Sequence, residues 1–462
     1  MSGPGSPRGG PAGADHGPSG AHGAAGAHRA PLGGPARVAV IGTGYVGLTT
    51  GAWLAHLGHQ VCCADVVAER VEGLGRGEVP FVEEGLEALV GEGLASGRLR
   101  FVLGAGASVA GAAVGGAEVV MLCLPTPQGA DGDADMSYVL SVAGEIGSLL
   151  DPGTVVVNKS TVPVGSARLV AAALGRSDVA VVSNPEFLRE GCAIADCAHP
   201  DRIVIGADDR AAAARVAGLF EGVEAPVIVT DPESAELVKY AANAFLATKL
   251  SFVNAVANLC ESVGADIGDV VRGIGYDHRI GGAYLRPGPG WGGSCFPKDT
   301  AALVRMGEAA GYDFDLLRRV IAVNEEQRAR VLSKVTSMAG GSLTGVTVAV
   351  WGLTFKARTD DRRGSPAMAI VARLAAAGAV VRAYDPTVGA PLPDMVVCAD
   401  AYSACEGASV VAVLTEWEEL RDLDLCKAGS AMRSRCMVDA RNLFEPSVVR
   451  AAGFRYVGTG RL

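Results

Sequence analysis

The segment from Val38 to Asp65 limits the possible folds of this chain more than any other feature. A β-branched run at residues 38–41 predicts a short buried strand, a glycine-rich turn follows and opens a helix, and a second strand ends at Asp65. Glycines let the backbone approach a pyrophosphate, the helix N-terminus stabilises its charge, and the acid accepts from a ribose hydroxyl. We therefore expect a dinucleotide site rather than a purely structural turn, with contacts from Gly42, Gly44, Tyr45, Val46 and Gly47.

The acid at position 65 also indicates which dinucleotide binds. A carboxylate here would repel a 2′-phosphate and accept from a free ribose hydroxyl, which favours NAD over NADP. Arg70 lies five residues further on and opposes this preference. The expected cofactor is NAD, with Asp65 and Arg70 near its ribose.

Strand and helix patterns alternate along the chain. Strand-like runs at residues 118–124, 155–159, 179–183 and 203–205 are separated by segments long enough for crossover helices. This alternation is typical of a mostly parallel sheet with helices on both faces. A second strand-turn unit begins at Val346, with a helix expected near residues 367–377. The expected fold class is α/β, with two doubly wound Rossmann-like domains joined by a long central helix.

That central helix is expected to begin at Pro232. Asp231 is a good capping residue, proline suits the first helical position, and no further proline or glycine occurs until Gly264. Such a helix would run about 45 Å, enough to link two domains and to offer an apolar face to a second subunit. Its period places Lys239 and Asn243 on one face. The expected divisions are a tail at 1–36, a dinucleotide-binding domain at 37–230, a central helical and dimerisation region at 231–340, and a second Rossmann-like domain at 341–462.

The first 36 residues consist mainly of Gly, Pro, Ala and Ser and have almost no bulky apolar side chains. Such a segment cannot bury enough surface to offset the entropy of ordering, so we expect a disordered tail. His16, His22 and His28 offer three possible metal ligands there. An irregular low-complexity tail explains them more simply, and no metal site is expected.

Charge and hydropathy argue against several classes of partner. The net charge of −10 gives no electrostatic reason to expect nucleic acid or an anionic membrane. No uninterrupted apolar run approaches the roughly 20 residues of a membrane span, and the N-terminus lacks a signal-peptide pattern. The 11 cysteines are scattered, which favours reduced thiols in a reducing compartment. We expect a cytoplasmic protein.

A second motif, residues 290–299, places Cys295 in a glycine-rich loop that a ligand can approach. Lys298 lies three residues later and is expected to favour the thiolate electrostatically. Most cysteines are inert core residues, so a structural role is the alternative to a nucleophile.

A third motif, residues 183–190, follows a strand and therefore lies at the carboxyl edge of the sheet, where ligands bind in this architecture. Glu186 and Glu190 are candidate general bases or water-positioning groups, and a solvated helix start is the alternative. Residues 159–163 and 125–127 occupy the same kind of edge.

A nicotinamide dinucleotide and a cysteine nucleophile in one chain suggest oxidation through a covalent intermediate. An aldehyde captured by Cys295 becomes a thiohemiacetal, whose oxidation gives a thioester that water hydrolyses to an acid. With Lys239 and Asn243 paired on one helix, the same site could begin from an alcohol.

Taken together, these motifs resemble the UDP-glucose/GDP-mannose dehydrogenase family over residues 37–441. The resemblance rests on five motifs in order, with Phe355-Lys356 and Arg441 as further support: 42–47, 159–163, 184–191, 239–245 and 290–299. It implies a double oxidation of the sugar C6 alcohol of UDP-glucose to UDP-glucuronate, using NAD twice. It also implies that the domain at 341–462 binds the UDP-sugar.

The resemblance implies a role for each matched residue. Cys295 resembles the nucleophile, and Lys239 and Asp299 resemble the groups that handle the alcohol proton and a catalytic water. Asn243 resembles a donor to the oxyanion, and Glu186 a group that assists thioester hydrolysis. Further cofactor contacts are implied at Thr126, Thr161, Glu190, Lys298 and Arg363, with Thr161 and Glu190 beside the catalytic water. Substrate contacts are implied at Glu186, Phe187, Leu188, Glu190, Lys239, Asn243, Tyr284, Arg286, Gly292, Phe355, Lys356 and Arg441.

The family also builds a homodimer on its long central helix. Arg279 matches an arginine that reaches the active site from the partner subunit. Four positions depart from the family pattern: Val82, Arg358, Arg362 and Gly364.

Two other functions stay open on sequence grounds. The same chemistry on GDP-mannose or a UDP-N-acetylhexosamine is the nearer alternative, although residues 199–204 resemble the UDP-glucose branch. The other is a non-catalytic dinucleotide-binding protein in which Cys295 is structural. A binding module would not require Cys295, Lys298, Asp299, Lys239 and Asn243 together.

Overall fold

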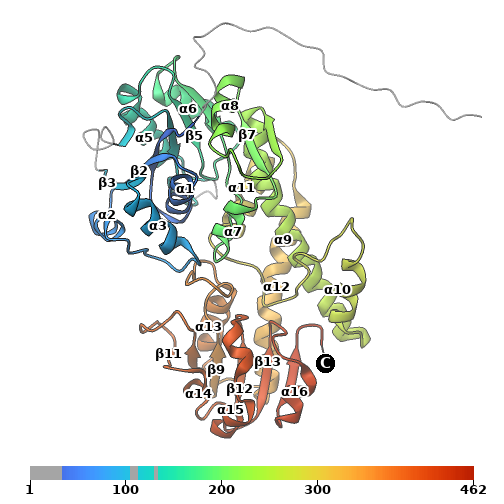
Figure 1. Ribbon diagram of the computed structural model, residues 1–462. Coiled ribbons are helices and arrows are strands. Elements are labelled where there is room, and N and C mark those ends of the chain that lie inside the picture. Colours follow the sequence, from blue (N-terminus) through green and yellow to red (C-terminus); the bar gives the residue numbers. More distant parts are fainter. Residues whose placement is uncertain (1–33, 105–112, 130–133, 462) are drawn as a thin grey trace, which may run out of the picture.

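The computed structural model describes residues 34–104, 113–129 and 134–461. Two α/β domains lie at opposite ends of the molecule, and two long helices run between them (Figure 1). The tail expected at 1–36 lies outside the described residues as far as residue 33. Ala36 is fully buried, and its N–H donates to His59 Nδ1 at 3.0 Å, so the described chain is anchored just before the first strand.

The first domain contains an eight-stranded sheet in the order β3-β2-β1-β4-β5-β6-β7-β8. All neighbours are parallel except β6 and β7, which pair antiparallel at Ser183 and Gly206. Chain order reverses between β1 and β4, the position where this architecture opens a crevice for a ligand. The strands are β1 (Arg37–Ile41), β2 (Gln60–Asp65), β3 (Leu99–Leu103), β4 (Val119–Leu122), β5 (Val155–Asn158), β6 (Ala180–Ser183), β7 (Ile203–Gly206) and β8 (Val227–Thr230).

Helices cover both faces of this sheet, and each face has its own apolar core. Val38 and Val40 point into one core, and Ala39 and Ile41 point into the other, as the period of two in a strand requires. The helices are α1 (Tyr45–His56), α2 (Ala68–Gly75), α3 (Leu86–Ala95), α5 (Ser137–Ile146), α6 (Ser166–Leu174), α7 (Ala193–Ala198) and α8 (Arg210–Gly218).

The central region is built on α9 (Pro232–Val263), a single helix of 32 residues. Asp231 caps it by accepting from the backbone N–H of Ser234 at 2.7 Å, and Gly264 ends it with φ +77°. The prediction of one long helix is confirmed. Around it lie α10 (Ile267–Gly275), α11 (Phe296–Ala309) and α12 (Asp315–Met338).

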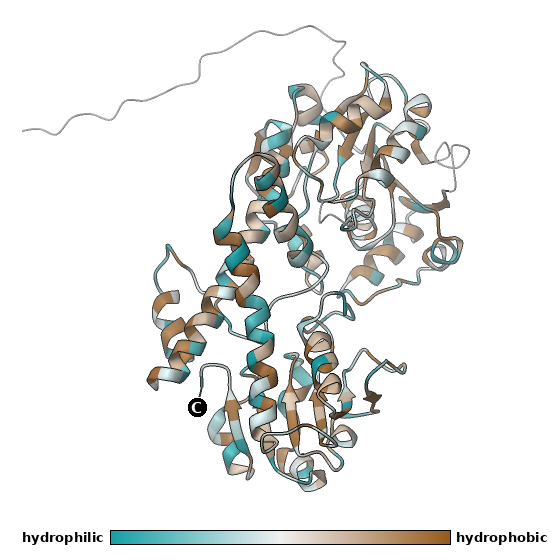
Figure 2. Cartoon of the chain, turned by 180° about the vertical axis from the view of Figure 1, so that it is seen from behind, coloured by the Kyte–Doolittle hydropathy of each residue, from teal (hydrophilic) through white to brown (hydrophobic). Residues whose placement is uncertain are grey.

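The outward side of α9 carries an apolar stripe. Phe245, Phe252 and Leu259 follow each other every seven residues and are 66%, 58% and 59% exposed. Figure 2 shows apolar residues along α9 and on the neighbouring α10. A seven-residue repeat keeps such residues on one side of a helix. Over the described part of the chain, no helix is both long and apolar enough to cross a membrane.

The second domain contains a six-stranded parallel sheet in the order β11-β10-β9-β12-β13-β14. Its strands are β9 (Thr347–Trp351), β10 (Val380–Tyr384), β11 (Val396–Val397), β12 (Val410–Val413), β13 (Cys436–Asp439) and β14 (Arg455–Gly458). Its helices are α13 (Pro366–Ala376), α14 (Ala401–Ala404), α15 (Leu425–Ala431) and α16 (Pro446–Ala451). The expected fold class, two doubly wound sheets joined by a long helix, is confirmed.

Candidate active site

The glycine turn after β1 is built so that side chains cannot replace Gly42 or Gly47. Gly42 has φ +96°, and a Cβ there would run into the carbonyl oxygen of Cys123 after the neighbouring strand β4. A Cβ on Gly47 would run into the carbonyl oxygen of Gly42, whereas the space around Gly44 is open. The close contacts at Gly42 and Gly47 pack α1 onto the sheet. The open space at Gly44 leaves the backbone accessible, as a pyrophosphate requires. Val46, also predicted as a contact, packs against the core instead of standing free.

The cleft beside this turn measures about 610 Å³ and lies between the two domains. From the first domain it is lined by the turn, Arg70 and the segment at 80–82, and from the second by residues 359–363. The exposed Val82, where the family usually has an aromatic residue, forms part of this wall.

Asp65 lies behind Thr43 and Arg70, two residues that line the cleft, and accepts four hydrogen bonds. It accepts from the N–H and hydroxyl of Thr43 at 2.8 and 2.6 Å, from the N–H of Val67 at 3.0 Å, and from Arg70 Nη1 at 3.1 Å. Burial opposes its charge, but these donors together hold the pKa of Asp65 below its usual value. Arg70 is thus bound to the carboxylate, and its charge does not stand free to receive a 2′-phosphate.

The substrate side of the first domain holds a buried ion pair between α9 and the loop after β6. Lys239 Nζ lies 2.8 Å from Glu186 Oε1, and the two side chains are only 4% and 6% exposed. The other oxygen of Glu186 accepts from the N–H of Leu188 at 2.7 Å. Burial disfavours both charges, yet their attraction raises the pKa of Lys239 and lowers that of Glu186. The pair is therefore ionised, and the Phe187 ring covers it with its centroid 5.4 Å from Lys239 Nζ.

A second buried carboxylate, Asp299, lies one helical turn into α11. Its Oδ2 accepts from Asn243 Nδ2 at 2.6 Å, and its Oδ1 accepts from Lys298 Nζ at 2.8 Å. Asn243 and Lys239 are both buried on the inner side of α9, as their spacing predicted.

Cys295 immediately precedes α11 and is partly accessible. Burial and the nearby Glu186 raise the pKa of its thiol to about 11, and Lys239 is the cation that opposes this rise. The expectation that Lys298 favours the thiolate is wrong, because the Lys298 ammonium is bound to Asp299. Sequence spacing suggested Lys298, which is close to Cys295 in the chain, whereas the cation that acts on the thiol is Lys239 of α9.

Glu190 lies between the cysteine loop and the second domain. Its Oε1 accepts from the Ser294 hydroxyl at 2.9 Å, and Arg363 Nη2 lies 3.5 Å away. Burial and the nearby Asp361 raise the pKa of Glu190 to about 7. Arg363 also binds Asp361 at 2.8 Å, and both residues belong to the second domain. The contact between Arg363 and Glu190 therefore joins the second domain to the first.

The backbone conformation accounts for the departure at Gly364 but not for the one at Arg358. Arg358 and Gly364 both have left-handed backbones, with φ +66° and +58°. The carbonyl of Gly364 fills the place where Gly292 would carry a Cβ, so the two loops touch backbone to backbone. Arg358 pairs with Glu418 at 2.8 Å. Nothing in the structure explains Arg362.

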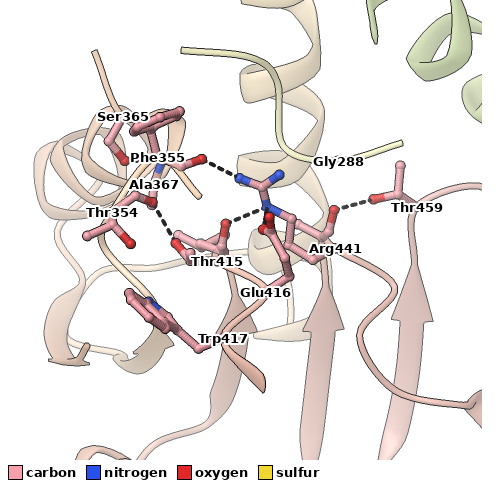
Figure 3. A network of polar contacts seen from close by, with 12 residues as sticks. Gly288, Thr354, Phe355, Ser365, Ala367, Thr415, Glu416, Trp417, Arg441 and Thr459 are labelled. Carbon is pink, nitrogen blue, oxygen red and sulfur yellow. Dashed lines mark hydrogen bonds and ion pairs between the residues drawn. The ribbon is translucent and has the colours of Figure 1, made fainter. Parts of the chain in front are cut away.

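The second domain contributes a polar network around Arg441 (Figure 3). Arg441 donates to the carbonyl oxygens of Leu414 and Phe355 at 2.9 and 2.8 Å and pairs with Glu416 at 3.0 Å. A Cβ on Gly288 would lie 3.3 Å from Arg441 Nη1, which places that end of the guanidinium against the loop before Cys295. Lys356 Nζ lies 5.6 Å from the Phe355 ring.

The remaining residues predicted to contact the ligands make different interactions within the chain. The Thr126 hydroxyl donates to the carbonyl of Thr161 at 2.9 Å, which joins two loops at the sheet edge. The Tyr284 ring lies 6.4 Å from that of Phe296, and Arg286 is exposed in the same loop. Arg279 is not brought to the site by its own chain. Its side chain is 78% exposed and pairs locally with Asp277 at 2.6 Å.

Two functional contacts escaped sequence reasoning. Glu83 is buried and accepts from the hydroxyl of Tyr45 at 2.7 Å and from the backbone N–H groups of Gly191 and Ala193 at 2.5 and 2.7 Å. It thus ties the dinucleotide turn to the loop that carries Glu186. Ser294 was read only as part of the cysteine motif. Neither residue has a periodicity or spacing that marks it.

Three family models match the chain. They are the NAD binding domain of the UDP-glucose/GDP-mannose dehydrogenase family at residues 36–224, the central domain at 233–326 and the UDP binding domain at 349–446. The chain is 43% identical to the UDP-glucose 6-dehydrogenase TuaD of Bacillus subtilis over 92% of its length and 93% of that protein. It is 44% identical to a UDP-glucose 6-dehydrogenase of Rhizobium meliloti, covering 92% of this chain and 99% of that one.

Solved structures are also similar. A UDP-glucose dehydrogenase from the archaeon Pyrobaculum islandicum superposes with a TM-score of 0.85 at 37% identity, over 94% of this chain and 100% of that chain. A UDP-D-ManNAc dehydrogenase from Pyrococcus horikoshii gives a TM-score of 0.81 at 27% identity, over 92% and 99%.

Proposed function

The chain belongs to the UDP-glucose/GDP-mannose dehydrogenase family, and from this premise we propose that it oxidises UDP-glucose to UDP-glucuronate with two molecules of NAD. The relatives that cover it end to end at 43–44% identity carry the name UDP-glucose 6-dehydrogenase. One observation supports the chemistry above all. Cys295 lies beside a buried, ionised Lys239–Glu186 pair, on the loop that joins the dinucleotide cleft to the second domain.

The alcohol step needs groups that hold the C6 oxygen and accept its negative charge. Lys239 is held as a cation by Glu186, so as an ammonium it stabilises an alkoxide, and it can receive the alcohol proton only after it has itself lost a proton. Asn243 uses one hydrogen of its amide on Asp299 and keeps the other for the oxygen at C6. NAD, when bound against the glycine turn, would supply the hydride acceptor that converts the alcohol at C6 to an aldehyde.

The aldehyde step uses the cysteine. Attack by Cys295 sulfur on C6 forms a thiohemiacetal, and removal of the second hydride leaves a thioester. Water then cleaves the C–S bond and restores the thiol. Glu186, with one oxygen on Lys239 and one on a backbone N–H, orients that water together with Asp299 and Thr161. In total one alcohol, two NAD and one water give one carboxylate, two NADH and three protons.

The second domain holds the diphosphate. An acidic protein must bind such an anion with a few fixed cations and oriented donors. Arg441 is held by two carbonyls, and Lys356 and Arg286 lie in the loops near it, so we assign these three cations to the UDP group. The expected domain boundaries likewise separate the NAD-binding domain from the domain that we propose binds UDP.

We also propose that the active enzyme is a homodimer. The stripe of Phe245, Phe252 and Leu259 supplies an apolar face for a partner helix. Arg279, exposed and remote from its own site, is then free to enter the partner's site.

The test is the number of NADH molecules produced per sugar nucleotide, measured with UDP-glucose, GDP-mannose and UDP-N-acetylglucosamine in parallel. Two NADH per UDP-glucose are expected. Preference for another sugar nucleotide would assign the same chemistry to a different sugar. Absence of NADH with all three sugar nucleotides would favour a non-catalytic binding protein. A Cys295→Ala variant should bind both ligands and form no acid, while retained acid production would remove the cysteine from the reaction.

A further inference from the structure

The Ser294 hydroxyl joins the cysteine sulfur to a carboxylate. Ser294 Oγ lies 2.9 Å from Glu190 Oε1 and 3.6 Å from Cys295 Sγ. The three groups come from two loops, residues 184–191 after β6 and the glycine-rich loop before α11. They form a continuous chain from the sulfur that attacks substrate to an acid at the domain interface.

The direction of the hydrogen bonds gives this chain a function. A hydroxyl has one hydrogen, and Ser294 gives it to Glu190, which has none to offer when ionised. The contact between Ser294 and Cys295 can then only be one in which the thiol is the donor. Each proton in the chain is therefore placed to move towards Glu190.

The other charged groups near the sulfur already have hydrogen-bond partners of their own. Lys239 is already a cation, and Glu186 has one oxygen on Lys239 and the other on a backbone N–H. Both oxygens of Asp299 are taken by Lys298 and Asn243. Among these carboxylates, Glu190 is the one that a hydroxyl connects to the thiol.

Glu190 is also suited to act as a base near neutral pH. It is faced by Asp361 and Arg363 from the second domain, by Ser294 from the cysteine loop and by Tyr45 from α1. Burial and Asp361 raise its pKa to about 7, which makes it a stronger base than an exposed glutamate. Its second oxygen, Oε2, is buried and makes no hydrogen bond among the residues that the structure describes.

We propose that Ser294 and Glu190 form a proton relay that deprotonates Cys295 as it attacks the aldehyde. The S–H bond breaks and its proton passes to Ser294 Oγ, while the hydrogen of Ser294 passes to Glu190 Oε1. The sulfur lone pair forms the C–S bond as the carbonyl π bond breaks, and the carbonyl oxygen becomes the oxyanion of the thiohemiacetal beside the Lys239 ammonium and the Asn243 amide. No group changes its oxidation state in this step. The proposal rests on the proposed function, because it requires Cys295 to be the nucleophile.

The test uses the second half-reaction alone. The 6-aldehyde of UDP-glucose is mixed with enzyme and NAD, and the single-turnover rate of NADH formation is measured from pH 5.5 to 10. The native enzyme should lose rate below a pH of about 7, where Glu190 becomes protonated. Ser294→Ala and Glu190→Gln should each lower the rate at pH 7.5 by about 100-fold. In both, the break near pH 7 should vanish and the rate should keep rising towards the ionisation of the thiol itself. Ser294→Thr keeps a hydroxyl and should recover most of the rate.

Ser141→Ala is the matched control. Ser141 donates to Glu145 at 3.3 Å on the exposed side of α5, so the variant removes a serine–glutamate contact outside the site and should leave rate and pH profile unchanged. Cys295→Ala separates the two proposals. If it still oxidises the aldehyde, the proposed function fails. If it is inactive while Ser294→Ala keeps the native rate, the relay alone is overturned. A slow Ser294→Ala that retains the break near pH 7 also overturns the relay, because Ser294 would then only position its neighbours.

Discussion

Charged side chains in this site are held in pairs, and the partner of each charge decides its chemistry. Lys239 would lose its charge if it were buried alone, since desolvation lowers the pKa of an ammonium. Glu186 keeps it ionised and is kept ionised by it. Asp65 likewise pairs with Arg70 beside the glycine turn. Single substitutions at these positions therefore change two residues, the one removed and the one left without its partner.

The Asp65–Arg70 pair predicts strong preference for NAD. A 2′-phosphate would meet an ionised carboxylate whose only cation is already engaged, so kcat/KM with NADP should be at least about 100-fold below that with NAD. Asp65→Asn removes the repulsion, releases Arg70 and should narrow this ratio by about tenfold. Steady-state kinetics with both cofactors measure the ratio. An unchanged ratio in the variant would show that Asp65 does not select the cofactor.

Glu190 predicts a pH dependence of stability. Between about pH 4.5, its ordinary pKa, and about 7, the folded protein keeps a proton that the unfolded chain releases. The free energy of unfolding should therefore fall as pH rises through this window, by up to about 3 kcal/mol. Urea unfolding at pH 5 and 7.5 measures the change. Glu190→Gln should flatten it, while Glu87→Gln, an exposed glutamate on α3, should not. Equal pH dependence in all three proteins would refute the assignment.

At the scale of elements, α9 has two different sides, one that we assign to catalysis and one that we propose for assembly. Lys239 and Asn243 lie on the inner side, against Glu186 and Asp299. Phe245, Phe252 and Leu259 lie on the outer side. One continuous helix of 32 residues can thus set the spacing between the groups proposed for catalysis and the proposed interface.

The stripe on α9 predicts that charged residues there break the dimer. Phe245→Asp together with Phe252→Asp places two carboxylates in the proposed apolar interface, and burial of unpaired charge is costly. The variant should elute as a monomer by light scattering and lose most of its activity, because Arg279 no longer reaches a partner's site. Leu316→Asp, on an exposed apolar position of α12, is the control and should remain dimeric. A dimeric double variant would place the interface elsewhere.

At the scale of the whole molecule, the end of the chain fastens the second domain to the central helices. The N–H of Gly460 donates to Glu261 on α9 at 2.7 Å, and its carbonyl accepts from Ile267 at the start of α10 at 2.9 Å. Lys334 on α12 donates to the carbonyl of Gly458 and pairs with Glu261. The cleft between the domains is therefore supported from the side opposite the cofactor turn.

This attachment predicts that alanine substitutions at two glycines lower the free energy of unfolding by unequal amounts. Gly460 and Gly407 have nearly the same backbone, with φ +70° and +67°. A Cβ on Gly460 would lie 2.7 Å from that of Ile267 and 2.8 Å from that of Ala257, whereas Gly407 faces open space. Gly407→Ala should cost about 1 kcal/mol of unfolding free energy from backbone strain, and Gly460→Ala about 1–3 kcal/mol more from overpacking. Chemical denaturation measures both, and equal losses would contradict the close packing.

The sequence by itself determined the local elements of this protein. The glycine turn, the acid at 65 and the proline-capped α9 each follow from short-range rules, such as the backbone freedom of glycine and the period of a helix. These rules act between residues close in the chain, so the two sheets and the shared side of Lys239 and Asn243 could be predicted. The order of the motifs also indicated the family.

Only the tertiary structure decided which groups meet. Lys298 is three residues from Cys295 in the chain but binds Asp299, and the cation that acts on the thiol comes from α9. Glu83 and Ser294 gained their roles from partners on other loops. A carboxylate or hydroxyl carries no sequence signal of its distant partner, because hydrogen bonds depend on positions in space. Burial, which raises the pKa of Cys295 and Glu190, is likewise a property of the packed molecule alone.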